Sequence, residues 1–194
     1  DWDSDGIVDD NFGLARTKVY LPGEKDYERE MLAQLVDYLF DNAFYRESAD
    51  VARYTLAQYK EDPENPKLHE QLVLALFRDE DMDSAFEERR QMGAFYGPDS
   101  AWYAAQQKAG NVDAMRYATD LARDNLIQSA QWFHEQAQKE RDEAIVNQDA
   151  EMLARAQNKY GLAAKTYAEF LKKHPNDKDS FKWNFFYAET LFYS

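Results

Sequence analysis

Apolar residues recur at the spacing of an amphipathic helix along nearly the whole chain after about residue 25. The first such stretch consists of Met31, Leu32, Leu35, Val36, Leu39 and Phe40. This spacing places the six side chains on one face of a helix, and no stretch alternates between apolar and polar residues as a half-buried strand would. The sequence therefore predicts an all-α fold.

Two kinds of turn divide the helical pattern. Proline stops it at residues 62–66, 97–99 and 174–177, because proline cannot continue the helical hydrogen-bond ladder. Shorter turns without proline fall at residues 41–43, 79–81 and 109–111. These turns delimit about nine helices, over residues 26–42, 44–61, 66–79, 82–95, 99–109, 111–122, 123–146, 149–174 and 178–193. Their alternation favours a solenoid of stacked helical hairpins over a generic helical bundle, which stays the alternative.

Short motifs repeat along this pattern. Residues 44–48 and 81–85 share one turn signature, and residues 110–114 show a looser form of it. Residues 164–177 contain Tyr-x-x-Phe-Leu-Lys-x-x-Pro before a further apolar helix. These motifs resemble the tetratricopeptide repeat, a helix–turn–helix unit of roughly 34 residues that ends near a proline. The spacing of the motifs is irregular, and the Trp-Leu-Gly signature of that family is not intact in any repeat.

The resemblance has implications for organisation and setting. It implies a tetratricopeptide-like repeat domain over residues 25–194, which we expect to continue beyond Ser194. The late motif is similar to repeats of bacterial cell-envelope assembly proteins, so the resemblance favours the periplasm or the outer membrane over the cytoplasm. In repeat solenoids the first helix of each pair lines the concave surface that binds extended peptides or partner helices.

Residues 1–24 form an acidic, turn-rich leading segment, which we expect to be extended around residues 18–21. Its first residues place oxygen donors at the spacing of a Ca²⁺ loop, with Gly6 at the sharp turn. The donors would be the side chains of Asp1, Asp3, Asp5 and Asp9 and the backbone carbonyl of Ile7. The loop resembles those of EF-hand, dockerin and thrombospondin type 3 proteins.

The calcium loop departs from those families at its last ligand. Phe12 stands where they place a glutamate or aspartate, so up to two oxygens are missing. Two readings therefore stay open: a weak Ca²⁺ site, or an acidic solvated linker. A weak site would suit an extracytoplasmic setting with millimolar calcium.

Composition argues against several classes of function. The net charge is −14, from 37 acidic and 23 basic residues, which would repel a nucleic acid. No apolar run is long enough to span a membrane. There is no cysteine for a thiolate site, and no phosphate-binding or nucleophile motif occurs. His69, His134 and His174 lie apart among polar neighbours, so we expect surface positions for them and no catalytic activity.

Aromatic residues supply the candidate partner-binding positions. Trp102, Gln106 and Asn184 lie on helices that would line the concave surface, and Trp183 and Phe186 belong to the aromatic cluster at residues 181–187. That cluster falls on different faces of one helix, so some of its rings should be exposed. We expect a non-catalytic scaffold that binds proteins or peptides; the alternative is a calcium-dependent structural or adhesive spacer.

A calorimetric titration tests the calcium loop. If the loop is a weak Ca²⁺ site, the wild-type protein should bind Ca²⁺ with a Kd of about 0.1–1 mM, and substitution of Asp3 and Asp5 by Asn should abolish the heat of binding. Replacing Asp83 and Asp120, acids outside the loop, should change nothing. Equal heats from the wild type and the Asp3/Asp5 variant would rule out the site.

Overall fold

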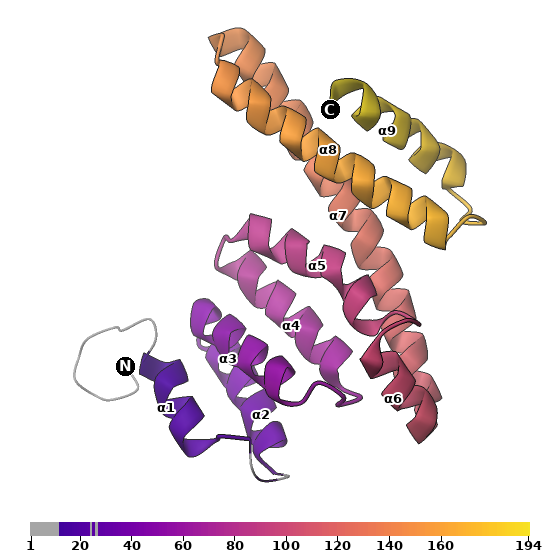
Figure 1. Ribbon diagram of the computed structural model, residues 1–194. Coiled ribbons are helices and arrows are strands. Elements are labelled where there is room, and N and C mark those ends of the chain that lie inside the picture. Colours follow the sequence, from indigo (N-terminus) through magenta and orange to yellow (C-terminus); the bar gives the residue numbers. More distant parts are fainter. Residues whose placement is uncertain (1–11, 24, 26) are drawn as a thin grey trace. The chain divides into compact units, whose positions relative to one another are not determined.

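The described part of the chain, residues 12–23, 25 and 27–194 of a computed structural model, is built of helices connected by short turns and contains no strand (Figure 1). In chain order the helices are α1 (Phe12–Tyr20), α2 (Glu28–Asp41), α3 (Tyr45–Gln58), α4 (Asn65–Arg78), α5 (Met82–Tyr96), α6 (Ala101–Ala109), α7 (Val112–Asn147), α8 (Ala150–Lys173) and α9 (Ser180–Tyr193). The all-α prediction is confirmed, and neighbouring helices pack as hairpins.

Two secondary-structure assignments made from the sequence were wrong. Residues 18–21 are not extended: residues 12–20 form α1, and the Leu21 amide donates a 2.8 Å hydrogen bond to the Thr17 carbonyl. Neither Gly nor Pro interrupts residues 14–21, so nothing there opposes a helix. The two helices expected at 111–122 and 123–146 are the single helix α7, because the sequence around residue 122 also lacks a helix breaker.

The tight turns share one capping geometry. After α2, α4, α6 and α7 the chain bends through a residue with positive φ: Ala43 at 64°, Glu80 at 62°, Gly110 at 76° and Gln148 at 53°. In each case the next amide donates to a carbonyl five residues back, as Phe44 does to Leu39 at 2.9 Å. This is the Schellman cap, which satisfies carbonyls that the end of a helix leaves unpaired.

Contacts divide the described chain into two compact units. The first comprises the described residues up to Glu88 together with Ala94–Ala118, and the second comprises Arg89–Gly93 and Thr119–Ser194. Each unit has its own apolar core, so each is considered by itself.

In the first unit α3 packs against both α2 and α4. Small residues on α3 permit the close approach: Ala49 and Ala52 are buried, and the Ser48 hydroxyl donates to the Val36 carbonyl at 2.9 Å. Leucines and valines from α2 and α4 fill the remaining space, with Leu32, Val36 and Leu72 almost fully buried. Burial of these apolar faces supplies the main stabilisation of the hairpins.

In the second unit α8 lies beside α9 (Figure 1), and aromatic rings fill the contact between the two helices. Tyr160, Tyr167 and Phe170 recur at helical spacing on α8 and are almost fully buried, and Tyr167 stacks on Trp183 of α9. The α8–α9 loop is fastened by Asp177, which accepts hydrogen bonds from Arg123 and from the Trp183 indole. The Arg123 hydrogen bond, more than the backbone amide of Asp179, lowers the pKa of Asp177 below its ordinary value.

A pair of phenylalanines tests the aromatic core. Phe170→Ala is expected to lower the free energy of unfolding by about 3–5 kcal/mol, because it leaves a cavity between α8 and α9. Phe181→Ala, at a side chain that is 88% exposed, should change it by no more than about 0.5 kcal/mol. Urea denaturation followed by circular dichroism measures both; similar losses would contradict the burial pattern.

Candidate functional site

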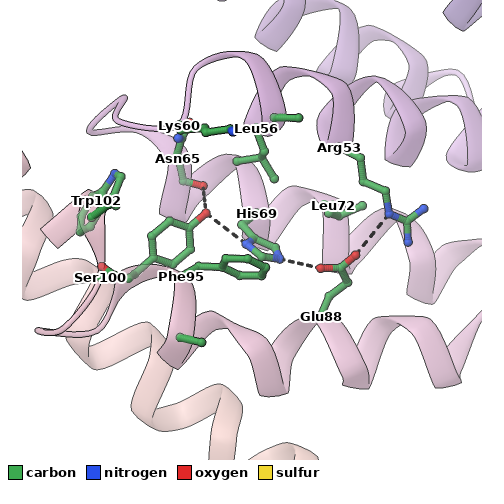
Figure 2. A pocket seen from close by; sticks show the side chains of 14 residues that line it. Arg53, Leu56, Lys60, Asn65, His69, Leu72, Glu88, Phe95, Ser100 and Trp102 are labelled. Atoms are coloured by element: carbon green, nitrogen blue, oxygen red, sulfur yellow. Dashed lines mark hydrogen bonds and ion pairs between the residues drawn. The ribbon is translucent and has the colours of Figure 1, made fainter.

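A pocket of about 490 Å³ opens in the first unit, between α3, α4, α5 and the start of α6 (Figure 2). Most of its wall is apolar, and the apolar side chains are Leu56, Ala57, Leu72, Ala94, Phe95, Ala101 and Trp102. Its size lies in the range of ordinary ligand-binding pockets. The pocket is therefore the candidate site of the first unit.

One wall follows from the helical repeat of α3. Arg53, Leu56 and Ala57 follow one another at i, i+3 and i+4, so they lie on one face at the end of α3. Lys60, two residues beyond the helix end, extends this wall of the pocket. The wall is apolar in its middle and carries a cation at each end. Figure 2 shows Arg53 and Lys60 at opposite ends of this wall, with Leu56 between them.

A chain of hydrogen bonds runs from Arg53 on this wall to residues of α4 and α5 (Figure 2). The Tyr96 hydroxyl lies 3.2 Å from the Asn65 carbonyl and 3.1 Å from His69 Nδ1. His69 Nε2 lies 3.0 Å from Glu88 Oε2, and Arg53 Nε donates to Glu88 Oε1 at 3.2 Å. The network thus joins α3, α4 and α5 across the pocket.

The donors and acceptors of this network limit how its protons can be placed. The Asn65 carbonyl and the Glu88 carboxylate can only accept, whereas the Tyr96 hydroxyl has one proton to donate. If Tyr96 donates to Asn65, both nitrogens of His69 must carry protons. If His69 is neutral and donates from Nε2 to Glu88, its Nδ1 takes the Tyr96 proton and the carbonyl loses that donor.

Burial and hydrogen bonding set the protonation of Glu88 and of the Tyr96 phenol in this network. Burial raises the pKa of Glu88, but hydrogen bonds and charge from His69 and Arg53 outweigh it and leave that pKa below its ordinary value. Burial, with a smaller effect of the nearby Glu88 charge, raises the pKa of the Tyr96 phenol. At neutral pH the network therefore contains a carboxylate and a neutral phenol.

The polar side chains that line the pocket differ in the number of hydrogen bonds and ion pairs that they form. Both oxygens of Glu88 are held by His69 and Arg53, and His69 is only 2% exposed. Lys60 is exposed at the rim, and it forms no ion pair or hydrogen bond with any residue that the structure describes. The arrangement presents an apolar cavity with one cation at its edge that forms no ion pair with a described residue.

The structure buries the two partner-binding candidates on α6. The Trp102 indole lines the pocket but is only 3% exposed, and it donates to the Asp62 carbonyl at 2.7 Å. Gln106 is also buried and donates to the Glu61 carbonyl at 2.6 Å. Both residues fasten α6 to the loop between α3 and α4, so their side chains are not exposed on an open surface.

The candidates on α9 occupy three environments. Trp183 is buried, and its indole donates to Asp177 at 3.1 Å. Phe186 is half-buried against the ring of His134, whereas Asn184 is exposed and donates to the Ser180 carbonyl at 2.8 Å. These three do not form one surface. The expected exposure of other rings in the cluster is confirmed, since Phe181 and Phe185 are exposed.

Histidine burial corrects another expectation. His69 and His134 were predicted at the surface, yet both are buried and have ring partners. The signal for His69 was its register: it lies on the buried stripe of α4 formed by Asn65, His69, Leu72 and Leu76, at helical spacing. Its partners Glu88 and Tyr96 lie two helical turns apart on α5, a pairing that no local motif reveals.

The calcium-loop residues Asp1, Asp3, Asp5, Ile7 and Asp9 lie outside the described residues. Within residues 12–23, 25 and 27–194, no group of three or more histidine, aspartate and glutamate side chains is arranged to hold a metal ion. None of the described helices combines the length and the apolar character that crossing a membrane requires. Comparison with family models, curated proteins and solved structures gave no match.

Removal of the Glu88 charge tests the network. Glu88→Gln is expected to lower the free energy of unfolding by roughly 1–3 kcal/mol at pH 7, because the hydrogen bonds to a charged acceptor are lost. A lowered pKa in the folded state means that the carboxylate stabilises the fold above its ordinary pKa of 4.5 and loses this effect as the pH falls through the lowered value.

The difference between wild type and Glu88→Gln should therefore shrink at pH 3, as measured by urea denaturation at both pH values. Glu143→Gln, at an exposed position on α7, is the control and should have little effect at either pH. A Glu88→Gln penalty that is equal at pH 3 and pH 7 would contradict the assigned role of the carboxylate.

Proposed function

We propose that this chain is a non-catalytic protein-interaction scaffold, and that the pocket of the first unit receives a side chain from a partner protein. The observation that carries the proposal is the open, largely apolar pocket of about 490 Å³. Apolar side chains in such pockets supply most of the binding energy of protein interfaces.

The mouth of the pocket favours a protein over a small molecule as occupant. Ala57, Ala94 and Ala101 are exposed around it, and Phe95 is 46% exposed. A small molecule inside the pocket would leave these apolar side chains in water. A partner chain that lies across the mouth would cover them, as the rim of an interface covers its central pocket.

Rigid walls would lower the cost of binding. The hydrogen-bond network fixes α3, α4 and α5 relative to one another, and Trp102 fixes the start of α6. A pocket that is already formed loses little conformational entropy when a partner enters. The same network uses the hydrogen-bonding capacity of Glu88, which supports a binding role for the site rather than acid–base chemistry.

The setting in a bacterial cell-envelope assembly is part of the proposal and is supported by the resemblance to tetratricopeptide repeats of such proteins. The calcium-dependent spacer stays a second proposal that depends on the sequence of residues 1–12 alone. The Ca²⁺ titration of the Asp3 and Asp5 variant tests it independently of the pocket.

Filling the pocket tests the scaffold function. Short random peptides displayed on phage are selected on the wild-type protein, and the enriched peptides are then measured by fluorescence polarisation. Ala57→Trp and Ala94→Trp, which place an indole at the mouth, are each expected to weaken these peptides at least about tenfold, which corresponds to about 1.4 kcal/mol.

Ala154→Trp, at an exposed position on α8 in the second unit, is the matched control and should leave affinity unchanged. Thermal melts establish that all three variants fold. Enriched peptides that bind both filled variants as tightly as the wild type would refute the pocket as the binding site.

A further inference from the structure

The charges around the pocket of the first unit are not balanced. Glu88 is the only acidic residue among those that line it, and Arg53 and His69 already hold its two oxygens. Lys60 lies two residues beyond the end of α3 and also lines the pocket. Its ammonium forms no ion pair with any described residue, although Glu61 follows it directly in the chain.

The start of α6, whose N-cap residue directly follows Asp99, lines the same pocket. Ser100 and Ala101 line the pocket, and the Ser100 hydroxyl caps α6 by accepting a 3.0 Å hydrogen bond from the Tyr103 amide. The amino end of a helix carries a partial positive charge. Figure 2 shows Ser100, Trp102 and Lys60 toward the same side of the pocket, away from Arg53 and Glu88.

We propose that the pocket selects an acidic partner segment: one large apolar side chain enters the cavity, and an Asp or Glu one or two residues away places its carboxylate at Lys60. This rests on the proposed function. The apolar side chain supplies most of the affinity through burial. The carboxylate supplies selectivity, because an ion pair at a solvent-exposed rim adds little affinity but excludes segments that carry a cation there.

The apolar wall and the cation constrain the partner together. An acidic segment without an apolar anchor would gain only a screened surface ion pair. An apolar segment with a lysine beside the anchor would meet Lys60 as a like charge. A segment that suits both the apolar wall and Lys60 therefore carries an apolar residue and an acidic residue within two or three positions. Its conformation elsewhere is not constrained by the pocket.

Peptide selection tests this chemistry. Peptides enriched on the wild-type protein are expected to share a Phe, Tyr, Trp, Leu or Ile with an Asp or Glu within two positions. Lys60→Glu is expected to weaken the same peptides roughly three- to tenfold and, in a fresh selection, to enrich Lys or Arg in place of the acid. Lys165→Glu, an exposed lysine of the second unit, should change neither result.

The outcomes separate the two proposals. If filling the pocket abolishes binding but the peptides show no acidic preference and Lys60→Glu has no effect, the acidic-segment proposal fails and the scaffold stands. If the Ala57→Trp and Ala94→Trp variants bind the peptides normally, the scaffold proposal and the acidic-segment proposal both fail for this pocket. If no peptide is enriched while 3-phenylpropionate shifts the amide resonances of Lys60 and Phe95, the occupant is a small molecule and the protein-segment proposal is overturned.

Discussion

Burial of His69 is the constraint on which the first unit depends. A ring that is almost fully enclosed on the apolar stripe of α4 must have partners for its polar atoms, because an unpaired buried nitrogen is costly. Those partners, Glu88 and Tyr96, both come from α5, two helical turns apart. Their pairing fixes the register of α5 on α4, and Arg53 extends the same constraint to α3. The pocket is the space that this arrangement leaves beside the apolar stripe.

The second unit depends on aromatic packing instead. Tyr160, Tyr167 and Phe170 fill the α8–α9 hairpin, and Asp177 ties its loop to Arg123. The rings of α9 point in several directions, and Phe181, Phe185 and Phe192 remain exposed. A helix with apolar residues on more than one side cannot bury all of them in a single hairpin.

Much of the fold could be predicted from the sequence, because apolar periodicity and proline positions are local signals. The turns at residues 41–43, 79–81 and 109–111 were placed correctly for this reason. The candidate site could not be predicted, since it requires His69 and Glu88 to meet across two helices. Trp102 and Gln106 were recognised as unusual residues, but only the tertiary structure shows that they bond to loop carbonyls. The helix α7 was divided wrongly because its length exceeds that of an ordinary repeat helix.

The Schellman turns depend on the helices that flank them. Three of the four place Ala43, Glu80 or Gln148, rather than glycine, in the left-handed conformation. Residues with a Cβ resist that conformation by about 1–2 kcal/mol, so these short sequences do not favour the bend by themselves. The bend is instead imposed by the burial of the flanking helices. A hairpin taken without its packed neighbours would therefore have no preformed corner around which to fold.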